Sequence, residues 1–164
     1  MAAIIIAAIA IGIYCGYQIP GTQPRKFLLD IHKSLGTTAL ALVAVRIAYR
    51  LFAGAPPYRK PLSSTVHASS QVAHALLYAL MVFMPLSGYL FSSAGGYSLP
   101  WFGLFQWPRL VPLDKGLASA GEWLHDRTAW LICGLLVLHI AAVLWHRLVE
   151  KDEVLARMTS GQGG

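Results

Sequence analysis

The segment from Glu122 to Arg147, EWLHDRTAWLICGLLVLHIAAVLWHR, constrains the fold more than any other. Its central run, AWLICGLLVL, carries no charge, and the segment is long enough to cross a bilayer as one helix. His125 lies near its start and His139 follows fourteen residues later. That spacing puts both imidazoles on one helix face, about 21 Å apart. Imidazole in hydrocarbon is costly and marks a functional site, so the segment predicts two metal centres at two membrane depths.

The composition predicts an integral membrane protein. Of 164 residues, 56% are hydrophobic and 12% are charged, and the mean hydropathy is +0.56. The expected fold is all-α, a bundle of four transmembrane helices forming one membrane domain over residues 1–164. The expected helices cover about residues 1–17, 32–52, 70–91 and 122–147, and residues 148–164 form a polar tail.

The charge and the cysteines narrow the class of ligand. The net charge is +6, but the basic residues lie at helix ends and in loops without forming a stripe, so no nucleic acid partner is expected. Cys15 and Cys133 fall inside apolar segments and are interpreted as packing residues. The chain contains no C-x-x-C-H motif. Any haem must therefore be held by histidines and packing, as a b-type haem.

His32 and His125 are the first candidate ligand pair. Each lies at the start of its span, and four spans put those two starts on the same side of the membrane. Two imidazoles at one depth can fill both axial positions of a haem between the second and fourth helices. Gly36, one turn after His32, leaves room for a flat ligand. The alternative is two unrelated interfacial histidines. With both axial positions filled, the iron suits one-electron transfer and has no open position for oxygen chemistry.

A second group of candidate cofactor-binding residues lies towards the other membrane face. His139 predicts a second haem, and its partner is left open. His74 is on the correct side but is expected about one turn nearer the surface, and His146 shares a helix with His139. Arg46 lies fourteen residues beyond His32 and either pairs with a haem propionate or a quinone-site group, or reaches the headgroups. His74, His146 and Arg46 are also candidates for a quinone site.

Several motifs resemble the bacterial cytochrome b561 family, which is related to the cytochrome b subunits of nickel–iron hydrogenases and formate dehydrogenases. The second helix contributes IHKSLG and VRIAYRL, the third AHALLYALMVFMPLSGYL, and the following loop PWFGLF. The fourth helix contributes WLHDRTAWLICGLLVLHIAAVLWH, followed by KDEVLARM. The spaced pair of His125 and His139 is the most specific of these features.

The resemblance implies two haem b sites. A periplasm-facing haem would be bound by His32 and His125. A cytoplasm-side haem would be bound by His139 and a histidine at the start of the first helix. No histidine precedes His32 in this sequence, so we expect that ligand to lie upstream of Met1. One haem is therefore expected, and two if that ligand is present or is replaced by His74.

The resemblance also implies the function and the location. We expect a multi-pass protein of the bacterial inner membrane, embedded in lipid, with both termini in the cytoplasm. It would transfer electrons between a small periplasmic one-electron donor, with superoxide as a candidate, and the quinone pool. No catalytic residue is assigned. The alternatives are a haem-bearing anchor for a periplasmic dehydrogenase or hydrogenase, and a haem-free bundle that handles zinc or copper.

Overall fold

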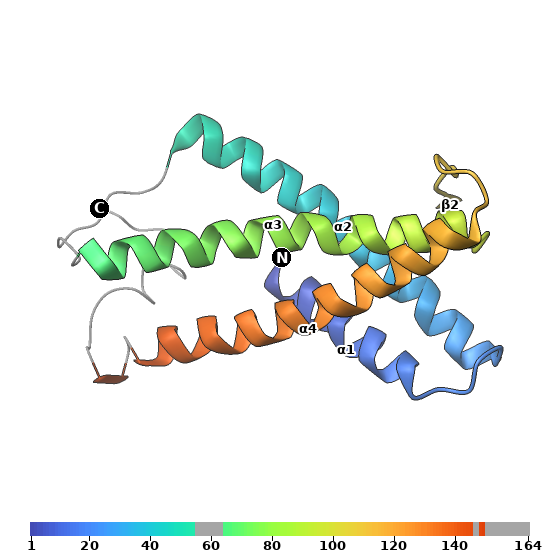
Figure 1. Cartoon of the computed structure of the whole chain (residues 1–164), viewed down its shortest axis with the longest axis horizontal. Helices are drawn as coiled ribbons and strands as arrows, with labels where there is room; N and C mark the ends of the chain where they lie inside the picture. The colour runs from blue at the N-terminus through green and yellow to red at the C-terminus, as the bar shows by residue number, and fades with distance from the viewer. Residues whose placement is uncertain (55–63, 146–147, 150–164) are drawn as a thin grey trace.

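The computed structural model describes residues 1–54, 64–145 and 148–149. Within these residues the chain forms four helices and one pair of very short strands (Figure 1). The helices are α1 (Ala2–Gly16), α2 (Gln23–Ala53), α3 (Ser64–Ala94) and α4 (Lys115–Trp145), and the strands are β1 (Pro100–Trp101) and β2 (Phe105–Gln106). The predicted all-α, four-helix membrane fold is confirmed.

Three of the helices have the length and composition of membrane spans. The segments Gln23–Ala53, His67–Ala94 and Lys115–Trp145 have mean hydropathies of 1.4, 1.7 and 2.1, and α1 is a shorter apolar helix. Only 6%, 11% and 11% of the residues in their apolar windows are buried inside the protein. Few of the residues in these windows are therefore buried inside the protein, as expected where the surrounding solvent is hydrocarbon.

The helices begin earlier than the apolar segments predicted. Helix α2 begins at Gln23 instead of residue 32, because Pro24 lies in the first turn, where its missing N–H costs no hydrogen bond. Helix α4 begins at Lys115 instead of residue 122, and the Asp114 carboxylate caps it by accepting a 2.8 Å hydrogen bond from the backbone N–H of Leu117. Apolar residues mark the part of a helix in hydrocarbon, whereas caps mark where the helix begins.

The helices pack as two pairs. Helix α1 packs against α2, and α3 packs along α4, while α2 also contacts α3 and β1. In Figure 1 the C-terminal half of α2 diverges from α3, and α1 extends only to about the middle of the bundle. The turn between α1 and α2 and the loop between α3 and α4 lie at the same end, which we call the loop end.

The loop of residues 95–114 is attached to α2 through Ser34, whose side chain is completely buried. Its Oγ atom lies 3.1 Å from the carbonyl oxygen of Pro100 and accepts a 2.9 Å hydrogen bond from the backbone N–H of Phe102. Trp101 donates through Nε1 to the hydroxyl of Thr38 at 3.0 Å. Lys33 donates to the carbonyl oxygen of Ser98 at 2.8 Å. These contacts fix the loop over the start of α2.

We predict that Ser34→Ala will lower the stability of the protein in detergent by about 1 kcal/mol, because it leaves the partly buried backbone N–H of Phe102 without its acceptor. Thermal unfolding followed by circular dichroism measures the change. Thr37→Ala is the matched control, because the Thr37 hydroxyl bonds only to carbonyls of its own helix. Equal effects of the two substitutions would contradict the anchoring role of Ser34.

Candidate metal centre

His32 of α2 and His125 of α4 face each other at the loop end. Their ring centres are 5.9 Å apart and the ring planes are nearly perpendicular, at 86°. Both side chains are half-buried. Within the described helices, α2 and α4 do not pack along one another, so the two rings meet across the interior of the bundle.

Each ring is held by a hydrogen bond to the neighbouring helix of its pair. The Nδ1 atom of His32 lies 2.8 Å from the carbonyl oxygen of Ala8 in α1. The Nδ1 atom of His125 lies 3.0 Å from the carbonyl oxygen of Met84 in α3, and 3.3 Å from the hydroxyl of Ser87. A carbonyl oxygen can only accept, so Nδ1 carries the proton in both rings. The Nε2 lone pair of each ring is then available to a metal ion.

The spacing of this pair fits a haem iron with two axial imidazoles. An iron bound by two opposed Nε2 atoms at about 2 Å each puts the ring centres about 6 Å apart. The observed separation is 5.9 Å. A Cβ atom added at Gly36, one turn after His32, would have no other atom within 4 Å. The space beside α2 at Gly36 is therefore open.

A second histidine pair lies towards the opposite end. The ring centres of His74 in α3 and His139 in α4 are 5.8 Å apart, with an angle of 73° between the planes. His74 was expected about one turn nearer the surface, but the structure brings the two rings together. The His74 side chain is exposed, and its Nδ1 atom lies 3.4 Å from the hydroxyl of Ser70. In the described part of the chain, neither ring of this pair bonds to a backbone carbonyl.

Arg46 has a neutral partner. Its Nε atom donates a 2.9 Å hydrogen bond to the hydroxyl of Tyr78. Tyr78 lies four residues after His74, on the same face of α3. Sequence reasoning missed Tyr78, and its helical spacing from His74 is the signal that could have found it. His146, the other candidate for this region, lies outside the described residues.

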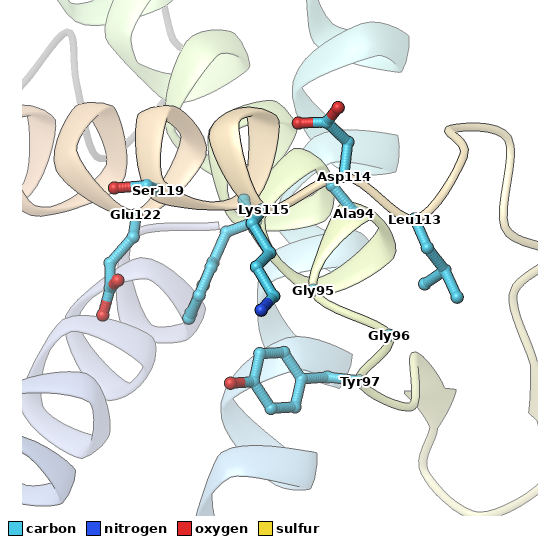
Figure 2. Close-up of a pocket in the computed structure, with 11 residues that line it drawn as sticks. Ala94, Gly95, Gly96, Tyr97, Leu113, Asp114, Lys115, Ser119 and Glu122 are labelled. Carbon is cyan, nitrogen blue, oxygen red and sulfur yellow. The ribbon is translucent and has the colours of Figure 1, made fainter.

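A cavity of about 610 Å³ lies at the loop end, between the end of α3, the loop and the start of α4. It is lined by Phe91, Ala94, Gly95, Gly96, Tyr97, Leu113, Asp114, Lys115, Ala118, Ser119 and Glu122. In Figure 2 the amine of Lys115 points towards the ring of Tyr97. The Nζ atom of Lys33 lies 5.8 Å from the centre of the same ring. Glu122 is three residues before His125, so the cavity lies within about one turn of the histidine pair.

The described cysteines, acids and histidines form no compact metal site. Within residues 1–54 and 64–145, no group of three or more His, Cys, Asp and Glu side chains could hold an ion. Cys15 is buried and Cys133 is partly buried, and both are free thiols.

The comparisons with known proteins identify the family. The sequence model of the family described as "Prokaryotic cytochrome b561" matches residues 1–161. The chain is 30% identical to Cytochrome b561 homolog 2 of Escherichia coli over 79% of this chain and 69% of that protein. It is 29% identical to the Probable superoxide oxidase CybB of Yersinia pestis over 90% of this chain and 85% of that protein. The chain therefore belongs to the prokaryotic cytochrome b561 family of multi-pass membrane cytochromes, and membership implies haem b.

Proposed function

We propose that this chain carries single electrons between a donor at the loop end and a quinone at the opposite end. The observation that carries the proposal is the opposed His32 and His125 pair, whose Nδ1 protons are both committed to backbone carbonyls. When bound, haem b supplies a reversible one-electron iron couple. His32 and His125 would hold it through Nε2, and their hydrogen bonds keep both imidazoles in one tautomer and one orientation.

The donor side is the loop end, which lies in the periplasm if the chain has the orientation that the family implies. Superoxide is the candidate donor, since one relative is named a probable superoxide oxidase. Two superoxide anions give two molecules of dioxygen and two electrons, and with two protons these reduce one quinone to a quinol. Lys33 and Lys115, which both lie near Tyr97, supply positive charge near the cavity.

The quinone side is the region of His74, His139, Arg46 and Tyr78. Arg46 donates to the phenolic oxygen of Tyr78, so the proton of that hydroxyl is free to bond to a quinone carbonyl. His74 is exposed and can provide a second polar contact. His139 remains the candidate ligand of a second haem, with the helix-one histidine of the family or His74 opposite. This end, and both termini, would be cytoplasmic in an inner-membrane protein.

We predict that His32→Ala and His125→Ala will each abolish the same haem signal, because each variant leaves the iron with only one of its two imidazole ligands. Pyridine haemochrome quantification per chain and reduced-minus-oxidised spectra of detergent-purified protein measure this. His67→Ala is the control, because His67 is exposed, lies two turns before His74 on α3, and has its Nε2 atom 3.3 Å from Gln71 of the same helix. Retention of the signal in either variant would contradict the pairing. A wild-type protein without haem would favour the haem-free metal-handling alternative.

We predict that Tyr78→Phe will raise the KM for quinone about tenfold with unchanged haem content, because it removes one hydrogen bond of about 1.4 kcal/mol and keeps the ring. Steady-state quinone reduction measures the effect. Tyr49→Phe is the control, since Tyr49 is 70% exposed on α2. An unchanged KM would exclude Tyr78 from the quinone site.

We predict that His74→Ala will keep the haem content of the wild type and impair quinone reduction, whereas His139→Ala will lower the haem content if the wild type holds two haems per chain. The reason is that the exposed His74 ring lacks the backbone anchor that both loop-end ligands have. Haem per chain distinguishes the outcomes. Loss of one haem in His74→Ala would make His74 the axial partner of His139 instead.

A further inference from the structure

We propose that Gly12 of α1 and Gly88 of α3 are positioning residues for the two loop-end imidazoles. Each glycine forms a notch in its helix that receives one histidine ring, and together the notches hold the two ring planes nearly perpendicular. This inference rests on the proposed haem site. Its new element is that two residues that do not touch the iron help to set the electronic properties of the iron.

The contacts show how closely each ring approaches its glycine. A Cβ atom added at Gly12 would lie 2.8 Å from Cε1 and 3.1 Å from Nδ1 of His32. A Cβ atom added at Gly88 would lie 2.8 Å from Cε1 and 2.9 Å from Nδ1 of His125. These distances are too short for any residue other than glycine unless the ring moves. The same arrangement therefore occurs twice, on two different helix pairs.

The hydrogen bonds explain why the notch must be a glycine. In both cases the carbonyl that accepts from Nδ1 belongs to the residue four positions before the glycine, Ala8 before Gly12 and Met84 before Gly88. A helical side chain leans towards the N-terminus and covers the preceding turn. Any side chain at these two positions would therefore cover the carbonyl that the imidazole needs. A glycine exposes the second lone pair of that carbonyl to a donor from the neighbouring helix.

Other helical glycines lack this relation to a ring. A Cβ atom at Gly16, Gly36 or Gly134 would have no other atom within 4 Å. At Gly121 the near atoms belong to the backbone of Phe91, so that glycine serves the close approach of α4 to α3. Gly12 and Gly88 therefore differ from the glycines that have open space beside them and from Gly121, where two helix backbones approach closely.

The consequence is a fixed angle between the two ligand planes, which is 86° in this structure. The angle between two axial imidazole planes determines how the iron d orbitals split, and so determines the highest g value of the oxidised low-spin iron. The Nδ1–H···O bonds also raise the basicity of Nε2, which favours the oxidised iron. The notches control both properties, because they set the ring plane and the distance to the carbonyl together.

The test is electron paramagnetic resonance of the oxidised wild-type protein and of Gly12→Ala and Gly88→Ala, with a redox titration of each. The wild type is expected to show the single, highly anisotropic low-field signal of perpendicular ligand planes, absent from His32→Ala. Each alanine variant should retain haem, move that signal and raise the midpoint potential. Gly16→Ala, one turn further along α1, is the matched control and should change neither.

The outcomes separate this inference from the proposed function. Wild-type protein without haem would overturn the haem site itself. Wild-type protein with haem but with the ordinary rhombic signal of parallel planes would overturn the positioning role alone, whatever the variants do. An unchanged signal together with an unchanged midpoint potential in both glycine variants would also overturn the positioning role. If an alanine variant loses its haem, the wild-type signal still decides the question.

Discussion

The hydrogen bond from an imidazole Nδ1 to a backbone carbonyl of the adjacent helix is the interaction on which the site depends. Both rings are half-buried, so each needs a hydrogen-bond acceptor within the protein. Ala8 supplies it to His32 and Met84 supplies it to His125. Each bond joins the two helices of one packed pair, α1 with α2 and α3 with α4. The bundle is therefore two helix pairs, each presenting one fixed imidazole to the space between them.

The sequence predicted His32 and His125 as candidate ligands, but it did not predict the contacts that hold their rings in place. His32 and His125 follow from counting helical spans, since each lies near the start of a span on the same membrane side. The open position at Gly36 could be predicted because Gly36 lies one helical turn after His32. The roles of Gly12 and Gly88 could not be predicted, because they depend on the register between neighbouring helices. That register is fixed by close approaches such as the one at Gly121, which no periodicity in the sequence encodes.

The second histidine pair shows a different limit of residue counting. Depth estimated from residue number assumes helices of equal tilt, and on that assumption His74 lies about one turn nearer the surface than His139. In the structure α3 and α4 are inclined to one another (Figure 1), and the two rings lie 5.8 Å apart. Tyr78 was identified in the same region by its hydrogen bond to Arg46. That bond joins α2 to α3, and the sequence alone could not show that these two residues meet.

The two ends of the bundle differ in how firmly their polar groups are held, and this difference supports their proposed division of labour. An electron-transfer centre works best when its ligands do not reorganise, and His32 and His125 are each bound to a helix backbone and packed into a notch. A site that exchanges a diffusible quinone needs accessible groups with unused hydrogen-bonding capacity. The exposed His74 and the hydroxyl of Tyr78 have both properties. Firmly held imidazoles at the loop end and available hydrogen-bond donors at the other end therefore suit the proposed transfer of single electrons to a quinone.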